Sequence, residues 1–258
     1  MSGSFSGRRV LITGSTRGIG HAAAVAFLSE GAEIIVHGRD QLAADKAAAD
    51  LAAPLGPAIH AIGADLLDRA AQDRLVHAAG AIDILVNCAG IFEESMLGGA
   101  DAGHWHRIIE VNLTAPWRLT RALLPTLRQR QGIIVNIGSD SGLLGYAGAS
   151  AYCASKGALI GLTRALAVEL APNIRVLCVC PGPVATDMMR NSVDHAPAPA
   201  AAQKEWESYT LLNRIAAPGE IAQAVLFAAS SKCTFQTGSV IVVDGGATAG
   251  RKINQASG

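Results

Sequence analysis

Charge is scarce in this chain of 258 residues, and neither sign dominates. Only 16% of the residues are charged, and 21 Lys and Arg balance 21 Asp and Glu. This balance excludes the strongly basic surface that is typical of nucleic-acid-binding proteins. Half of the residues are hydrophobic, which argues against a disordered chain and permits a large buried core.

Cysteine pairs with metal-ligand spacing are also missing. The five cysteines form no CxxC pair, so we expect reduced thiols rather than disulfides or a zinc site. We place Cys178 and Cys180 in the core, on opposite faces of one strand, where they cannot pair. The histidines of His104-Trp105-His106 point to different faces of a helix and have no acidic partner at ligand spacing, so we expect no metal site.

Apolar stretches of membrane-spanning length are absent as well. The stretch from Ala158 to Leu170 is interrupted by Arg164 and Glu169, well short of the roughly 18 residues that a span needs. Met1 to Arg9 lacks the apolar core of a secretory signal. We therefore expect a soluble protein that stays in the cytoplasm.

The chain does contain a regular alternation of short β-rich runs with longer Ala- and Leu-rich helical patterns. Several runs are apolar at nearly every position, as expected of parallel strands covered by helices on both faces. With right-handed crossovers, this order predicts one doubly wound α/β domain over residues 1–258. The predicted strands are Arg9–Thr13, Glu33–His37, Ala58–Ile62, Ile82–Asn87, Gly132–Ile137, Ile174–Cys180 and Ser239–Val243.

One long connection, from Thr186 to Ala217, follows the sixth predicted strand and contains the Pro/Ala-rich stretch from Ala196 to Ala202. Segments that long between elements are usually lids or mobile loops, so we expect residues 187–213 to cover a substrate. No spacing there selects a particular molecule. Its apolar candidates are Met188, Met189, Trp206 and Tyr209, and its candidates for meeting an anion are Arg190 and Lys204.

A glycine-rich turn links the first predicted strand to the first helix. The run Gly14-Ser15-Thr16-Arg17-Gly18-Ile19-Gly20 precedes a helical pattern from His21 to Ser29. Glycines let the backbone approach a pyrophosphate, and the helix N-terminus offers N–H groups and the positive end of its dipole. This context predicts a dinucleotide site, although the turn taken alone is also compatible with a plain tight connection.

The end of the second predicted strand favours NADP(H) over NAD(H). Gly38 stands where an acidic residue would bind the adenosine ribose and repel a 2′-phosphate. Arg39 comes next, and Arg17 lies in the glycine turn, so two guanidiniums could bracket a phosphate. The alternatives are an effect of Asp40 and a merely solvated Arg39, so NAD(H) remains possible.

The most specific pattern is Tyr152 followed four residues later by Lys156, with Ser139 thirteen residues before the tyrosine. Residues i and i+4 share a helix face, so the ammonium would lower the pKa of the phenol and make it an acid/base group near neutrality. Ser139 follows a buried strand, at the sheet edge where ligands bind. Its hydroxyl could hold a substrate carbonyl or alcohol.

These motifs together resemble the short-chain dehydrogenase/reductase family over essentially the whole chain. The matching residues are Thr13-Gly14, Gly18-Ile19-Gly20, Asn87-Cys88-Ala89-Gly90, Ser139, Tyr152, Lys156 and Pro181-Gly182. The resemblance implies a single Rossmann-like domain with a seven-stranded parallel sheet, usually in a homotetramer. It also implies that Tyr152 exchanges a proton with the substrate oxygen, Lys156 lowers its pKa and binds the nicotinamide ribose, and Ser139 orients the substrate.

Asn112 matches the asparagine of the family that completes a proton relay, through a water held on its main-chain carbonyl. Pro116 lies four residues further along a helical pattern that runs from Asp101 to Arg128. Proline has no N–H, so the carbonyl of Asn112 lacks its helical donor. A plain proline kink without a chemical role is the alternative.

Further cofactor contacts follow from the same match. Asp65 would meet the adenine amino group, or cap a helix from Leu66 onward, or do both. Cys88 stands where the family has asparagine, and the loop after the sixth strand would place the Val184 backbone and the Thr186 hydroxyl at the carboxamide. The complete predicted cofactor set is Gly14, Ser15, Thr16, Arg17, Gly18, Ile19, Gly20, Arg39, Asp65, Leu66, Asn87, Ala89, Gly90, Tyr152, Lys156, Pro181, Gly182, Val184 and Thr186.

The sequence therefore predicts an NADP(H)-preferring enzyme that interconverts a secondary alcohol and a ketone, without nucleic-acid or membrane partners. The first alternative is a 3-oxoacyl-(acyl-carrier-protein) reductase, against which the neutral charge argues, because docking an acidic carrier favours a basic surface. A dinucleotide-binding sensor without catalysis is the second, and the intact set of catalytic residues argues against it. Near the sheet edge, Asp140 and Ser141 could meet a polar substrate, whereas Glu93 and Glu94 are by default solvated.

Overall fold

A parallel sheet forms the centre of the computed structural model, which describes residues 3–55 and 59–250. Seven strands within these residues pair in the order β3-β2-β1-β4-β5-β6-β7. Val10 of β1 lies opposite Ile34 of β2 on one side and opposite Ile84 of β4 on the other. The strands are β1 Arg9–Ile12, β2 Glu33–Gly38, β3 Ile59–Gly63, β4 Ile84–Asn87, β5 Ile133–Ile137, β6 Arg175–Pro181 and β7 Val240–Val243.

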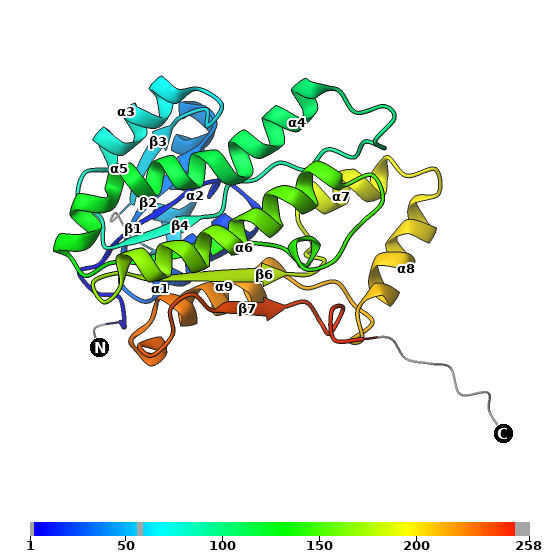
Figure 1. Ribbon diagram of the computed structural model, residues 1–258. Coiled ribbons are helices and arrows are strands. Elements are labelled where there is room, and N and C mark those ends of the chain that lie inside the picture. The colour runs from blue at the N-terminus through cyan, green and yellow to red at the C-terminus, as the bar shows by residue number, and fades with distance from the viewer. Residues whose placement is uncertain (1–2, 56–58, 251–258) are drawn as a thin grey trace.

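Helices cover both faces of this sheet, as Figure 1 shows. The α-helices of the described residues are α1 Gly18–Ser29, α2 Gln41–Leu55, α3 Arg69–Ala79, α4 Ala102–Ile109, α5 Ala115–Gln129, α6 Ser150–Leu170, α7 Asp187–Asp194, α8 Pro199–Tyr209 and α9 Pro218–Ala229. One apolar core lies between the sheet and α1, α2 and α9, and the other lies between the sheet and α3, α5 and α6. This arrangement confirms the predicted doubly wound fold.

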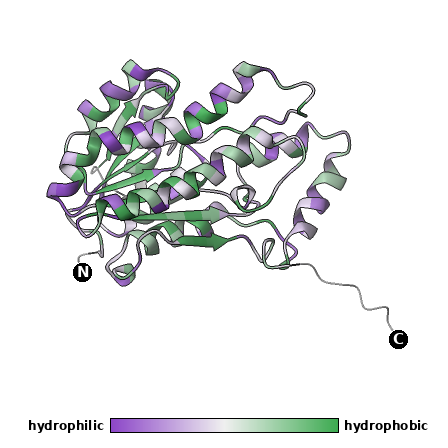
Figure 2. Ribbon diagram, viewed as in Figure 1, coloured by the Kyte–Doolittle hydropathy of each residue, from purple (hydrophilic) through white to green (hydrophobic). Residues whose placement is uncertain are grey.

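The strands divide their side chains between these two cores. In β1, Val10 and Ile12 belong to the first core and Leu11 to the second, as the two-residue period of a strand requires. Both sides of the sheet are therefore apolar, and the strands are predominantly green in Figure 2. The near-continuous apolar runs of the sequence follow from this double coverage.

One expectation about local structure is wrong. Cys178 and Cys180 share one face of β6, with their Sγ atoms 3.7 Å apart, because residues two apart in a strand point to the same side. The connection expected as a lid or loop contains two helices, α7 and α8. Pro199 begins α8 rather than breaking it, since the first turn of a helix needs no N–H from that residue.

The predicted helix from Asp101 to Arg128 is interrupted at Asn112. A π-helical turn, Glu110–Thr114, joins α4 to α5, and the N–H of Ala115 donates to the carbonyl of Glu110, five residues earlier. Pro116 follows directly in the first turn of α5. The disturbance expected from this proline therefore takes the form of a π turn rather than a sharp break.

The predicted strand limits agree with the observed ones to within two residues, and Ala58, the predicted start of the third strand, lies outside the described residues. In the described part of the chain, no helix is both long and apolar enough to span a membrane. The sheet order reverses between β1 and β4. A crevice at the carboxyl ends of these strands is the usual ligand site of such sheets.

Candidate active site

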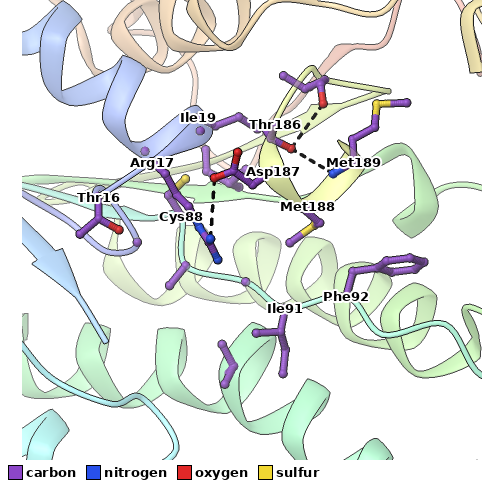
Figure 3. Close-up of a pocket in the computed structure, with 18 of the residues that line it drawn as sticks. Thr16, Arg17, Ile19, Cys88, Ile91, Phe92, Thr186, Asp187, Met188 and Met189 are labelled. Carbon is purple, nitrogen blue, oxygen red and sulfur yellow. Dashed lines mark hydrogen bonds and ion pairs between the residues drawn. The ribbon is translucent and has the colours of Figure 1, made fainter. Parts of the chain in front are cut away.

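A cavity of about 840 Å³ opens at the carboxyl edge of the sheet. Its wall runs from the glycine turn after β1, past the ends of β2, β4 and β5, to the loop after β6 and the lid helices α7 and α8. Figure 3 shows part of this wall, with Arg17 and Asp187 facing each other across it. Of the predicted site residues, those that line it are Gly14, Thr16, Arg17, Gly18, Ile19, Gly20, Arg39, Asp65, Leu66, Ala89, Gly90, Ser139, Tyr152, Lys156, Pro181, Gly182, Val184 and Thr186.

The other three predicted residues lie behind the wall and hold it in shape. Ser15 donates from Oγ to the carbonyl of Ile12, 2.7 Å away. Asn87 donates from Nδ2 to Oδ1 of Asn136 at 2.8 Å. Asn112 binds both backbone groups of the loop residue Ile91, accepting its N–H and donating to its carbonyl at 2.9 Å each.

The glycine turn packs closely against the loop after β4. Gly14 has a φ of +66°, and a Cβ there would lie 2.7 Å from Cα of Ala89. Arg17 occupies the N-cap position of α1 without a side-chain capping bond, and the first turn of α1 contains no acidic residue. The N–H groups of this helix end therefore fit an anion such as the pyrophosphate of a dinucleotide.

His37 binds and stabilises the glycine turn, a role that no sequence pattern indicated. Its Nδ1 accepts the N–H of Gly14 at 3.1 Å, while Nε2 lies 2.9 Å from the carbonyl of Ala64 and can only donate to it. Burial lowers the pKa of His37 to about 4, so the ring is neutral at pH 7. No local pattern predicts this contact, because the histidine comes from the neighbouring strand.

The end of the cavity near β2 carries more cations than the sequence suggested. Arg39 lines it, and Lys46 of α2 does so too. Asp40, which also lines this end of the cavity, accepts the N–H of Ala43 at 2.9 Å and so caps the start of α2. Arg17 has a partner that the sequence did not reveal, since its Nη1 lies 3.7 Å from Oδ2 of Asp187.

Tyr152 and Lys156 lie one turn apart on α6 and both face the cavity. Lys156 donates from Nζ to the carbonyl of Ile137, at the end of β5, over 2.7 Å. The same Nζ is 5.6 Å from the centre of the Tyr152 ring. Phe92 packs edge-on against that ring, with 5.2 Å between the ring centres, so the phenol is held from two sides.

Burial dominates the acidity of this pair. It raises the pKa of Tyr152 to about 12, against a smaller lowering by a hydrogen bond with Ser139. Burial also lowers the pKa of Lys156. In the protein alone, desolvation of the phenolate sets the direction of the Tyr152 pKa, and the lowering by Lys156 stays a prediction.

Ser139 lies in a network of hydroxyl groups around the buried carboxylate of Asp140. Ser139 donates from Oγ to Oδ1 of Asp140 at 3.0 Å and accepts the N–H of Ser141 at 3.1 Å. Tyr146 donates to Oδ2 of the same carboxylate at 3.0 Å and is also hydrogen-bonded to Tyr209 of α8. Burial raises the pKa of Asp140, and these hydrogen bonds oppose the rise. Asp140 was predicted as a possible substrate contact, whereas no sequence pattern indicated Tyr146.

The structure decides one further sequence interpretation. Asp65 accepts the N–H of Leu67 at 2.9 Å, whereas α3 begins at Arg69 and is capped by Asp68, so Asp65 is not a helix cap. Cys88 lines the cavity, and burial raises its pKa to about 12, which keeps the thiol neutral. Among the described residues, no three His, Cys, Asp or Glu side chains gather as metal ligands.

The lid begins against the glycine turn. Thr186 caps α7 by accepting the N–H of Met189, as Figure 3 shows, and a Cβ on Gly18 would lie 3.2 Å from Cγ2 of Thr186. Of the apolar lid residues, Met188, Met189 and Trp206 line the cavity. Neither Arg190 nor Lys204, the expected anion contacts, is part of that lining, and Arg190 is paired with Asp187.

Comparison with known proteins gives full-length matches. A family model described as "Enoyl-(Acyl carrier protein) reductase" matches residues 14–248. The chain is 35% identical over 245 residues to 3-oxoacyl-(acyl-carrier-protein) reductase FabG of Chlamydia muridarum, covering 93% of this chain and 96% of that protein. It is 39% identical over 246 residues to cyclopentanol dehydrogenase of Comamonas sp., with the same coverage. A solved short-chain dehydrogenase/reductase (glucose/ribitol dehydrogenase) from Brucella melitensis superposes with a TM-score of 0.87 at 33% identity, covering 96% and 99% of the two chains.

Proposed function

The chain belongs to the short-chain dehydrogenase/reductase family of NAD(P)(H)-dependent oxidoreductases that act on CH–OH groups, and we propose that it prefers NADP(H) and interconverts a secondary alcohol with a ketone. The observation that carries this proposal is a convergence of elements that lie far apart in the sequence. Ser139, Tyr152 and Lys156 line the same cavity as the glycine turn after β1. A dinucleotide and a substrate can therefore meet at one phenol.

The residues of the cavity divide the work of such a reaction. The glycine turn and the N-terminus of α1 would hold the pyrophosphate, and the loop from Pro181 to Thr186 would cover the nicotinamide. Bound there, the nicotinamide supplies or accepts the hydride. Tyr152 would exchange a proton at its hydroxyl with the substrate oxygen, Ser139 would hold that oxygen, and Lys156 would hold the ribose.

The preference for NADP(H) rests on the end of the cavity near β2. Gly38 stands where an acidic residue would repel a 2′-phosphate, and Arg39 and Lys46 line the wall there. Asp50 lines the same wall and pairs with Lys46 at 2.7 Å, which leaves Arg39 as the cation for a phosphate. Asp40 is engaged at the start of α2. A guanidinium can bind a phosphate with two parallel hydrogen bonds, so Arg39 is the residue on which selectivity depends most.

The second candidate is a 3-oxoacyl-(acyl-carrier-protein) reductase. The observation in its favour is the similarity to FabG of Chlamydia muridarum along nearly the whole chain. Against it stands a chain in which 21 basic residues balance 21 acidic ones, since an acidic carrier favours a basic docking surface. The similarity to cyclopentanol dehydrogenase is at least as high in identity and supports a small alcohol or ketone instead.

We also propose a homotetramer that assembles through α4, α5 and α6 and works in the cytoplasm. Trp105 of α4 and Trp117 of α5 are 45% and 41% exposed, and exposed tryptophans on these two helices fit a surface that packs on another copy. The five free thiols fit a reducing compartment. Light scattering on the purified protein tests the assembly, and a monomer would refute it.

The experiment that separates the candidates is NADPH oxidation with a 3-oxoacyl thioester, run beside NADH and a panel of sugars, polyols and cyclic ketones. We expect turnover with a cyclic or small ketone and faster reaction with NADPH than with NADH. Turnover of the thioester alone would favour the carrier-protein reductase. NADPH binding without turnover of any compound would favour the non-catalytic sensor.

A further inference from the structure

The side chain of Asp140 is a buried carboxylate beside the reacting serine, and the mechanism above does not use it. It is 5% exposed and lines the cavity. Within the described part of the chain, no Lys, Arg or His lies within salt-bridge distance of it, and its hydrogen-bond partners are hydroxyl groups. Burying a carboxylate without a cation is unfavourable unless hydrogen bonds compensate, so the arrangement of these hydroxyls is fixed by the charge that they stabilise.

One of these hydroxyls belongs to Ser139, and the contacts define where its hydrogen points. A serine hydroxyl has one hydrogen to donate and two lone pairs to accept with. The hydrogen of Ser139 goes to Oδ1 of Asp140 at 3.0 Å, and one lone pair takes the N–H of Ser141 at 3.1 Å. The remaining lone pair is left for the neutral hydroxyl of Tyr152 and a substrate oxygen, whereas a phenolate at Tyr152 would compete with Asp140 for the hydrogen of Ser139.

The other oxygen of the carboxylate leads to the lid. Tyr146 donates to Oδ2 of Asp140 at 3.0 Å and is hydrogen-bonded to the hydroxyl of Tyr209, the last residue of α8. The ring of Trp206, also on α8, lies 6.3 Å from Tyr146 and 5.9 Å from Tyr209. In Figure 1, α8 stands beyond the carboxyl ends of β6 and β7, so this contact joins the edge of the sheet to the lid helix.

We propose that Asp140 is a positioning residue that fixes the hydroxyl of Ser139 and, through Tyr146 and Tyr209, ties this serine to the lid helix α8. This role rests on the proposed function, because it concerns how the serine meets a substrate oxygen. With its hydrogen held by Asp140, Ser139 presents an acceptor, which suits the hydroxyl of an alcohol. A ketone can receive a hydrogen bond from Ser139 only when the serine turns away from Asp140.

The proposal is tested by a double-mutant cycle of Asp140→Asn and Ser139→Ala, assayed with the alcohol and ketone that the panel identifies. We expect Asp140→Asn to lower kcat about tenfold, the equivalent of one charge-assisted hydrogen bond, with the Kd of NADPH within about twofold of wild type. In the Ser139→Ala background, the same change should alter kcat by less than about twofold, since the group through which Asp140 acts is gone. Equal losses in both backgrounds would overturn the positioning role.

A separate variant tests the hydrogen bond between Tyr146 and Tyr209 of the lid helix α8. Tyr209→Phe keeps the ring and removes the hydroxyl that reaches Tyr146, so we expect KM to rise severalfold while kcat stays within about twofold. An unchanged KM would overturn the tie between the serine and α8. Should Asp140→Asn fail to fold, Tyr146→Phe replaces it in the cycle with Ser139→Ala, because it removes a neighbouring hydroxyl and leaves the charge.

Asp83→Asn is the matched control. Asp83 is also a buried carboxylate, 4% exposed, but it lies before β4 at the opposite edge of the sheet, where it pairs with Arg8 and Arg130. Its replacement should lower thermal stability and leave kcat unchanged. A wild-type chain that binds NADPH but transfers no hydride to any compound of the panel would overturn the proposed function and this role together. If the wild type is active and the effects of Asp140→Asn and Ser139→Ala on kcat are additive, only this role is overturned.

Discussion

At Tyr152, the surroundings of one phenol decide when it can act as a base. Burial holds its pKa at about 12, so almost none of it is ionised at pH 7. A positive charge close to a phenol favours the phenolate and lowers the pKa. An oxidised nicotinamide carries such a charge, so the dinucleotide itself should help to activate this residue.

We therefore predict that adding NADP⁺ lowers the pKa of Tyr152 by about one unit or more. The measurement is a spectroscopic titration of phenolate, recorded as the difference between wild type and Tyr152→Phe to remove the signals of Tyr146 and Tyr209. Below the shifted pKa, the rate of alcohol oxidation should rise with pH, because the phenolate is the proton acceptor. NADPH, which lacks the charge on its ring, is the control, and an equal shift with both cofactors would contradict this explanation.

The side chain of Arg39 should determine the preference for NADPH over NADH. Replacing Arg39 with Asp should lower kcat/KM with NADPH and raise it with NADH, changing their ratio by about tenfold or more, because a carboxylate repels the 2′-phosphate and accepts from the ribose. Steady-state kinetics with both cofactors measure the ratio. Arg74→Asp, an exposed change on α3 away from the cavity wall, is the control. An unchanged ratio in Arg39→Asp would leave the preference without its proposed cause.

The site residues that the sequence predicts differ from those that it does not predict in how they are spaced along the chain. Ser139, Tyr152 and Lys156 were predicted because their spacing along the chain is itself the signal. His37 and Tyr146 act on residues of other elements, namely Gly14 and Tyr209, and neither contact leaves a local pattern. Burial is likewise a property of the folded chain, which is why the raised pKa of Tyr152 was not foreseen.

At the scale of elements, the π turn between α4 and α5 connects the helix layer to the cavity wall. Asn112 lies in this turn and binds both backbone groups of Ile91, which follows Gly90 of the wall. A Cβ on Gly90 would lie 3.4 Å from Oδ1 of Asn112 and 3.6 Å from Nζ of Lys156. The turn therefore fixes the loop after β4 close to Lys156.

Asn112→Ala should lower the free energy of unfolding by about 1–3 kcal/mol, because two backbone groups of Ile91 lose their partners. It should also reduce turnover, since the loop after β4 borders the site. Urea unfolding and kcat measure the two effects. Asn173→Ala, in the connection before β6, is the control for an asparagine outside this contact. Stability equal to wild type would show that the asparagine does not hold the loop.

Most elements followed from periodicity, and the exceptions have identifiable causes. Most strands were predictable because they contain at least three consecutive apolar residues, as in Val10-Leu11-Ile12 of β1 and Ile34-Ile35-Val36 of β2. The lid helices were not, because α7 has only eight residues and the Pro- and Ala-rich start of α8 resembles a loop until Pro199 is placed in its first turn. The shared face of Cys178 and Cys180 follows directly from the two-residue period of β6 and needed no structure.

At the scale of the whole molecule, the cavity draws its wall from both halves of the sheet. A bound dinucleotide would contact the ends of β1, β2, β4 and β6, so it should stabilise the entire fold. At about 100 times its Kd, NADPH should add about 2.7 kcal/mol to the free energy of unfolding. For a chain of this length, that corresponds to a rise in Tm of roughly 5–10 °C.

Thermal unfolding with NADPH and with NADH at equal concentrations measures this stabilisation, and the larger shift should come from NADPH. Gly14→Ala is the matched variant, because its Cβ would lie 2.7 Å from Ala89 in a backbone conformation that favours glycine. Its own Tm should respond little to either cofactor. Equal shifts in Gly14→Ala and wild type would mean that the dinucleotide binds elsewhere.

The central claim is that Tyr152 transfers the proton in a dinucleotide-dependent reaction, and Tyr152→Phe tests it most directly. The substitution removes one hydroxyl and keeps the ring that packs on Phe92. We predict that Tyr152→Phe binds NADPH with the affinity of wild type and no longer oxidises it with the ketone that wild type reduces. Turnover retained in Tyr152→Phe would contradict the account.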